Sequence, residues 1–136
     1  MKFNIRKLTE NDWDTLVSWW ESWPKWNTPA QDFLPGNATS GLMVEKNNIP
    51  IVAGFLYFTN SAAVLLEWII SNPEYKEKDK KKAIETLVSS AEIFCKNNNK
   101  KYMFSIGRNK SLLNIHKQLD WTVDNDPSYE MIKKIT

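Results

Sequence analysis

Apolar and polar residues follow each other with a changing period along the chain, and this period predicts a strand and then a helix in the N-terminal part. Alternation from Phe3 to Leu8 has a period of two and predicts a short strand. Thr9 stands three residues before Asp12, a spacing typical of a capping box at a helix start. One face of the following helix, at the i, i+3, i+4, i+7 spacing, is marked by Trp13, Leu16, Val17 and Trp20. Trp23 precedes a proline and predicts the helix end, because such a residue avoids the helical region.

The middle of the chain carries three apolar runs, which predict consecutive antiparallel strands at residues 41–45, 49–59 and 63–71. Lys46-Asn47-Asn48, between the first two runs, has the composition of a hairpin turn. Residues 24–40 contain Pro and Gly and predict a second short helix or an ordered loop before these strands.

The second half of the chain predicts helices and strands in alternation. Helical patterns cover residues 83–96, in a helix that begins near Lys80, and residues 110–119. A strand is expected at residues 102–106, and a closing pair of strands at 121–123 and 129–135. Together the elements predict a single α+β domain over residues 1–136, with a mixed, mostly antiparallel sheet and helices on both faces.

Composition narrows the classes of function. A hydrophobic fraction of 42% and a net charge of +2 are typical of a globular domain. No apolar run approaches the roughly 20 residues of a membrane span, and the N-terminus does not read as a signal peptide, so we expect a cytoplasmic protein that binds no membrane. A single Cys and a single His argue against a metal site. Nearly all basic residues are Lys, which disfavours a reader of nucleic-acid grooves.

A lone carboxylate interrupts the apolar run at residues 63–71. Alternation places Glu67 on the face of Leu65 and Ile69. A carboxylate there must face water or a cleft to avoid desolvation, and in a cleft its raised pKa would suit a general base. An outward-facing residue on a half-solvated sheet is the alternative interpretation.

A charged segment precedes the helix that begins near Lys80. Residues 74–82 hold five lysines and three acidic residues. Because the first N–H groups of a helix have no internal acceptors and the helix dipole is positive there, this end fits a phosphate-bearing ligand. A solvated charged loop is the alternative.

Two further features carry candidate chemistry. His116 lies two helical turns after Asn109 on the same helix face and could be structural or catalytic. Five tryptophans crowd the first part of the chain. We expect Trp13, Trp20 and Trp23 to lie in the core, and Trp19 and Trp26 to face a ligand, where an indole could meet a cation.

Two segments resemble motifs of the GCN5-related N-acetyltransferases (GNAT). Pro73-Glu74-Tyr75 matches the start of that family's loop P-[DE]-Y-[RQ]-x-x-G-x-[GA], in which Asp79 and Lys81 take the two glycine positions here. The family's later motif N-x-x-A-x-x-x-Y-x-K-x-G-F is similar to the segment from Asn109 to Trp121, with His116 at the tyrosine position. The order of helices and strands also resembles that of the family, over most of the chain.

This resemblance implies a GNAT fold and an acetyl-CoA-dependent N-acetyltransferase that acts on a small-molecule amine. Glu67 would take the proton of the amine, and His116 would protonate the leaving thiolate. Backbone groups of Ile69, Ile70 and Ser71 would contact the pantetheine arm, and Asn109 the cofactor arm. The pyrophosphate would lie on the backbone N–H groups of Lys76, Glu77, Lys78, Asp79, Lys80, Lys81 and Lys82. The acceptor pocket would lie along residues 19–36, with Trp19, Trp26 and Phe33.

The missing glycines leave a second function open. Glycine permits unusual φ angles in such a loop, and a non-glycine residue forced into one costs about 1–3 kcal/mol. Direct contacts from the lysines could offset this loss. Otherwise the chain would be a catalytically degenerate module that binds a ligand or partner without acetyltransferase activity. The closing strands would offer an edge for a homodimer.

Overall fold

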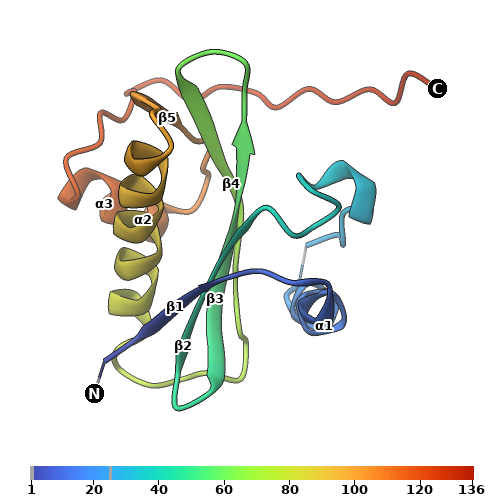
Figure 1. Ribbon diagram of the computed structural model, residues 1–136, viewed down its shortest axis with the longest axis vertical. Helices are drawn as coiled ribbons and strands as arrows, with labels where there is room; N and C mark the ends of the chain where they lie inside the picture. The colour runs from blue at the N-terminus through green and yellow to red at the C-terminus, as the bar shows by residue number, and fades with distance from the viewer. Residues whose placement is uncertain (1, 25) are drawn as a thin grey trace.

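The computed structural model describes residues 2–24 and 26–136 and has one five-stranded mixed sheet in the order β1-β2-β3-β4-β5. The first four strands are antiparallel neighbours, and β5 runs parallel to β4. Helix α1 covers one face of the sheet, and α2 with α3 lies on the other (Figure 1). The strands are β1 (Asn4–Lys7), β2 (Gly41–Lys46), β3 (Ile49–Phe58), β4 (Ala63–Ser71) and β5 (Tyr102–Phe104). The helices are α1 (Trp13–Ser22), α2 (Lys80–Asn97) and α3 (Lys110–Gln118), with short 3-10 turns at Glu10–Asp12 and Gln31–Phe33.

Charged side chains fix the start of α1 against β1, as the spacing of Thr9 and Asp12 predicts. The Thr9 N–H donates to the Asp12 carboxylate at 2.8 Å. The Arg6 guanidinium donates to both oxygens of the same carboxylate, at 2.8 and 2.9 Å, and pairs with Glu45 of β2 at 3.1 Å. The hydrogen bond from Arg6 is the main reason that the pKa of Asp12 lies below its ordinary value.

The β2–β3 hairpin turns on two asparagines, and the predicted turn at residues 46–48 is confirmed. Asn47 and Asn48 have φ angles of 53° and 63°. Positive φ at both central residues defines the type I′ turn, whose twist matches that of two antiparallel strands and which favours Asn and Gly. The turn presents Lys46 at its near end, beside the loop that leads into α2.

The sheet separates two hydrophobic cores, because successive residues of a strand point to opposite faces. Val44 of β2 belongs to the core that includes Leu87 of α2. The preceding residue, Met43, belongs to the core that includes Trp20 of α1. The expected apolar face of α1 is therefore used, and Trp20 at its centre is fully buried.

A β-bulge in β4 changes which face each residue takes. Phe55 of β3 pairs with Glu67, whereas Ala53 pairs with Ile70, so β4 has one residue more than β3 over this stretch. Trp68 lies in the bulge with a φ of +56°. Simple alternation predicts that Glu67 shares a face with Ile69; this prediction is wrong, because the extra residue places Ile69 in the α2 core while Glu67 stays opposite Phe55 on the α1 side.

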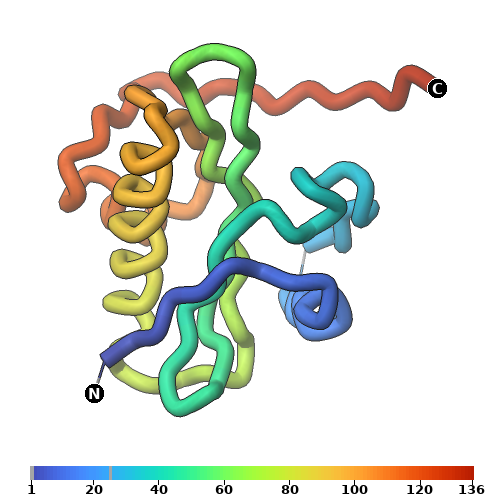
Figure 2. The backbone as a smooth tube through the Cα atoms, in the orientation of Figure 1, coloured from blue at the N-terminus to red at the C-terminus, as the bar shows by residue number. Residues whose placement is uncertain are grey.

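The closing pair of strands predicted at residues 121–123 and 129–135 is not formed, and this prediction is wrong. The end of the chain runs extended beyond the sheet without pairing with any strand of the described residues (Figure 2). An alternating pattern gives a segment one apolar face, but the segment becomes a strand only if its backbone pairs with an edge strand of the sheet. Tyr129, Met131 and Ile135 remain more than four-fifths exposed. The homodimer edge expected from these strands is therefore not present in this form.

The other expectations differ from the structure in detail. Residues 24–40, apart from Lys25, which lies outside the described residues, contain the 3-10 turn and otherwise irregular backbone. The strand predicted at residues 102–106 ends at Phe104. No helix of residues 2–24 and 26–136 is both long enough and apolar enough to cross a membrane.

Candidate active site

Strands β4 and β5 pair over three residues only and then part at Glu67. The last pair is Leu65 with Phe104. Beyond it, the Ser105 hydroxyl donates to the Leu66 carbonyl at 2.6 Å, and the Ile106 N–H donates to the Glu67 carboxylate at 2.6 Å. The Glu67 carboxylate thus accepts the hydrogen bond that a backbone carbonyl would accept if the parallel ladder continued. The two strands therefore diverge from this point.

Burial controls the charge of Glu67, which is half-buried at this divergence. Desolvation raises the pKa of its carboxyl above the ordinary value, and the hydrogen bond from the Ile106 N–H offsets part of the increase. A carboxylate with a raised pKa, held by one backbone hydrogen bond, is able to accept a further proton. The half-buried position of Glu67 leaves the alternative of an outward-facing residue on a half-solvated sheet open.

Aromatic side chains gather on the α1 side of the sheet, where the cross-strand pairing places Glu67. Tyr57 donates its phenol hydrogen to the Phe33 carbonyl at 3.2 Å, and desolvation raises the pKa of Tyr57. The ring of Phe33 meets the edge of Trp68 at 5.9 Å between centroids. Phe33 is 45% exposed, so a ligand at this surface would touch it. Neither Tyr57 nor Trp68 was expected from the sequence, because only the bulge brings Trp68 to this face.

The predicted acceptor residues are only partly at the surface. Trp26 is 48% exposed and available. Trp19 is 4% exposed and lies in the α1 core with Trp20, so its expected role at a ligand surface is wrong. The reason is that the buried stripe of α1 is wider than the i, i+3, i+4, i+7 face and takes in the neighbouring residue.

The indole of Trp23 closes part of the free edge of β4. The Asn72 N–H donates to the Ile51 carbonyl, so by alternation the backbone of Ile70 faces β3 and that of Ser71 faces outward. The Trp23 indole N–H donates to the Ser71 carbonyl at 2.8 Å. The ammonium of Lys80 lies 5.2 Å from the centroid of the Trp23 ring. The aromatic segment is thereby joined to both β4 and the start of α2.

The start of α2 presents unpaired backbone donors. Among the described residues, no acceptor lies within hydrogen-bond distance of the N–H groups of Lys81 and Lys82, the second and third residues of the helix. The loop before them needs no glycine conformation, because Asp79 has a φ of −91° and no residue from 72 to 98 has a positive φ. The backbone of this loop therefore carries none of the φ strain that a non-glycine residue at a glycine position could have caused.

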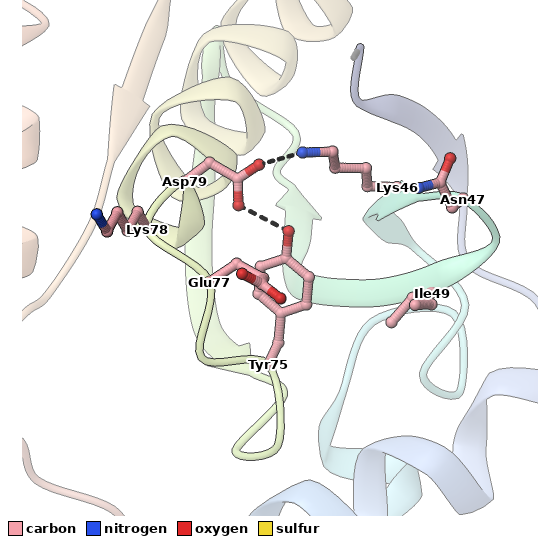
Figure 3. A pocket seen from close by; sticks show the side chains of 7 residues that line it. All are labelled: Lys46, Asn47, Ile49, Tyr75, Glu77, Lys78 and Asp79. Atoms are coloured by element: carbon pink, nitrogen blue, oxygen red, sulfur yellow. Dashed lines mark hydrogen bonds and ion pairs between the residues drawn. The ribbon is translucent and has the colours of Figure 1, made fainter.

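The carboxylate of Asp79 is turned away from these donors. It accepts a hydrogen bond from the Tyr75 hydroxyl at 2.7 Å and forms an ion pair with Lys46 from the β2–β3 hairpin (Figure 3). A cavity of about 440 Å³ opens at this place, lined by Lys46, Asn47, Ile49, Tyr75, Glu77, Lys78 and Asp79. This cavity is lined by none of the residues around Glu67, so the two places are separate.

Helix α3 uses both of its predicted site residues internally. The Asn109 side chain caps the helix by accepting from the N–H groups of Ser111 at 2.8 Å and Leu112 at 3.2 Å. His116 is 5% exposed, with Nδ1 at 2.8 Å from the Leu112 carbonyl and its ring against the edge of Trp121. Its other nitrogen, Nε2, is buried and has no partner among the described residues. Nε2 is therefore the ring nitrogen that is available for proton transfer.

Sequence comparisons identify no relative: no protein-family model matches the chain, and no curated protein matches its sequence. No cluster of potential metal ligands occurs in the part of the chain that the structure describes.

Solved structures of acetyltransferases have the same fold. An aminoglycoside acetyltransferase from an uncultured soil metagenomic sample, in complex with trehalose, aligns over 98% of this chain and 97% of its own at 11% identity and a TM-score of 0.68. AAC(6')-Iy, in complex with the bisubstrate analogue CoA-S-monomethyl-acetylneamine, aligns over 99% and 100% at 15% identity and a TM-score of 0.66. The ribosomal-protein-S18-alanine N-acetyltransferase from Escherichia coli aligns over 87% and 76% at 11% identity and a TM-score of 0.70. The chain thus has the GNAT fold that the motif resemblance implies.

Proposed function

We propose that this chain, which has the GNAT fold, is an acetyl-CoA-dependent N-acetyltransferase acting on a small-molecule amine. The observation that carries the proposal is the divergence of β4 and β5 at Glu67. A half-buried carboxylate with a raised pKa stands where the two strands part, beside an aromatic surface. It lies on the strand whose outward Ser71 N–H is left for a cofactor arm, while the Ser71 carbonyl accepts from Trp23.

The residues around this divergence fit coenzyme A. The N–H groups of Lys81 and Lys82 are free to bind a pyrophosphate, and the helix dipole and the neighbouring lysines favour its charge. The outward N–H of Ser71 would meet the pantetheine arm, with Ile69 beside it in the bulge, while Ile70 faces β3. The side-chain amide nitrogen of Asn109 is left for the cofactor arm, because only its oxygen caps α3. Bound acetyl-CoA supplies an activated acetyl thioester.

Two side chains would move the protons of the transfer. Glu67 takes the proton that the amine must lose as the new N–C bond forms, directly or through a water molecule. His116 gives a proton from Nε2 to the sulfur as the C–S bond breaks, while Nδ1 stays on the Leu112 carbonyl. Backbone N–H groups of β4 at the bulge would stabilise the oxyanion.

The acceptor would lie on the α1 side against exposed aromatic rings. Phe33 and Trp26 present these rings, Trp68 lies partly buried against Phe33, and Glu67 supplies a negative charge on the same face as Trp68. A cationic amine suits both features, since ammonium groups bind carboxylates and aromatic faces. One of the structural neighbours was solved in complex with the aminoglycoside sisomicin. We therefore place the substrate among small cationic amines.

A second candidate function is a binding module that keeps the fold without catalysis. The burial of His116 and its hydrogen bond inside α3 favour this alternative, because such a ring is held as a structural residue would be. In this case the protein would bind coenzyme A or another anion and turn over no substrate.

Thermal unfolding with and without coenzyme A tests the proposal. At a hundred times Kd, the ligand should stabilise the protein by about 2.7 kcal/mol, seen as a rise in Tm. Release of free thiol from acetyl-CoA in the presence of a panel of cationic amines then separates the enzyme from the binding module. If millimolar coenzyme A produces no Tm shift, neither the acetyltransferase nor a module that binds coenzyme A can be correct.

A further inference from the structure

The two principal helix starts on the α2 side of the sheet treat their capping residues in opposite ways. Asn109 turns its side chain onto the N–H groups of the second and third residues of α3. Asp79 holds the same position on α2, but its carboxylate accepts from none of the N–H groups there. Aspartate is as good a cap as asparagine, so its residue type does not explain the difference. Asn109 has the extended ψ of 123° that is typical of a cap, whereas Asp79 has a ψ of 9°, and an interaction with other side chains holds its carboxylate in this arrangement.

That interaction comes from two side chains outside the helix (Figure 3). Lys46 reaches over from the β2–β3 hairpin and pairs with one carboxylate oxygen, while the Tyr75 hydroxyl donates to the other at 2.7 Å. Tyr75 is buried, and its hydrogen bond to Asp79 raises its pKa to about 12, so it stays a donor at neutral pH. Both carboxylate oxygens are thus engaged on the side of α2 that faces the hairpin.

We propose that Lys46 and Tyr75 are positioning residues for the pyrophosphate of coenzyme A, which act by holding the Asp79 carboxylate off the free N–H groups of Lys81 and Lys82. This inference rests on the proposed function. We refer to the three side chains Lys46, Tyr75 and Asp79 as the carboxylate clamp.

The physical reason is competition for one pair of donors. A released Asp79 would be able to change its ψ from 9° to the extended range, where Asn109 has 123°, and its carboxylate would then reach the N–H groups of Lys81 and Lys82 as the Asn109 side chain does on α3. The carboxylate would then occupy the donors that a phosphate needs and would repel the phosphate by its charge. Where the family has a glycine that carries no side chain, this chain has a carboxylate that the clamp draws aside.

Binding of coenzyme A to clamp variants tests this inference. Lys46→Met should raise the Kd for coenzyme A by about ten- to a hundredfold, the loss expected when charged hydrogen bonds are broken. Tyr75→Phe keeps the buried ring and should raise Kd in the same direction by a smaller factor. Lys101→Met removes an exposed lysine that directly precedes β5, beyond the C-terminal end of α2, and should leave Kd unchanged.

The decisive comparison adds Asp79→Gly. In that background the carboxylate is gone, so Lys46→Met should have no further effect on Kd. If Lys46 instead contacts the phosphate itself, the loss persists with Asp79→Gly and the clamp is overturned. S-acetyl-pantetheine, which lacks the pyrophosphate, should bind wild type and Lys46→Met equally.

The outcomes separate this inference from the proposed function. A wild-type protein that does not bind coenzyme A would overturn both. A wild-type protein that binds it, with Lys46→Met and Tyr75→Phe binding equally well, would overturn the clamp alone. Should Lys46→Met fold poorly, Tyr75→Phe in the presence and absence of Asp79→Gly gives the same comparison.

Discussion

The carboxylate of Glu67 accepts a hydrogen bond from the backbone N–H of Ile106 at the point where β4 and β5 stop pairing. The Glu67 side chain thereby ends the ladder between the two strands and stays half-buried where they part. The structural and the chemical roles of Glu67 can be separated, because a neutral amide keeps an acceptor oxygen for Ile106 but cannot take a proton.

Glu67→Gln should lower kcat/KM by about 100- to 10,000-fold, the usual contribution of a general base. Thiol release from acetyl-CoA with a cationic amine measures this loss. Glu10→Gln, an exposed carboxylate far from β5, is the matched control and should leave the rate unchanged. A Glu67→Gln enzyme with undiminished activity would remove the carboxylate from the mechanism.

Protein stability should respond to Glu67 with a definite sign. The pKa of Glu67 is raised in the folded state, so its contribution is most favourable below the ordinary pKa and is lost as pH rises through the folded value. Thermal unfolding should therefore show Glu67→Gln as stable as wild type or more stable at pH 8, with the difference moving against the variant towards pH 4. The activity of the wild type should fall over the same interval as the base becomes protonated. A variant that is less stable at pH 8 than at pH 4, relative to wild type, contradicts this assignment.

His116→Phe tests the proposed acid. The benzyl ring keeps the contact with Trp121, and Nε2 has no partner to lose, so the variant gives up only the hydrogen bond between Nδ1 and the Leu112 carbonyl, and the free energy of unfolding should fall by about 0.5–1.5 kcal/mol. The rate should fall by about tenfold or more if the imidazole protonates the thiolate. His116→Tyr keeps a side-chain proton donor and should retain part of the activity that His116→Phe loses. An unchanged rate in His116→Phe would assign His116 to the core alone.

Asp12→Asn tests how the N-terminal strand is joined to α1. The variant weakens the charged hydrogen bonds from Arg6 and Thr9, and the free energy of unfolding at pH 7 should fall by about 1.5–3 kcal/mol. The pKa of Asp12 is lowered by folding, so its contribution is present above the unfolded value and is lost as pH falls through the folded one. Urea unfolding at pH 7 and pH 3 should show the difference shrinking at pH 3. Asp14→Asn, on an exposed carboxylate of the same turn, should change stability by no more than about 0.5 kcal/mol.

Local patterns predict most of this fold because most of its elements are decided locally. The span of β4 is confirmed at residues 63–71, since an apolar run between a turn and a proline leaves few alternatives. The asparagines at 47 and 48 decide the hairpin turn in the same way. The prediction of a strand at residues 129–135 fails for the opposite reason. The pattern of this segment alternates, but a strand there would have to pair with a sheet edge that is distant in the chain.

The candidate site depends on contacts that no local pattern contains. The sequence indicates Glu67 as an unusual carboxylate, yet its partner Ile106 lies beyond α2 and is named by no motif. Lys46 looks like an ordinary turn residue until the loop before α2 comes to lie beside the hairpin. A carboxylate at a helix start signals a cap, and only the folded chain shows that the cap of Asp79 is not made.

The bulge at Trp68 divides β4 into two halves whose even-numbered residues face opposite sides of the sheet. Before it, Val64 and Leu66 fill the core under α2; after it, Ile70 fills the core under α1. Ile69 in the second half belongs to the core under α2 as well, so substitutions at 64, 66 and 69 should be felt by α2 and substitutions at 70 by the α1 side. A deletion of Trp68 would leave β4 with as many residues as β3 over this stretch, so the ladder would become regular while Ile69 and Ile70 kept their faces, and the indole on the α1 side would be lost.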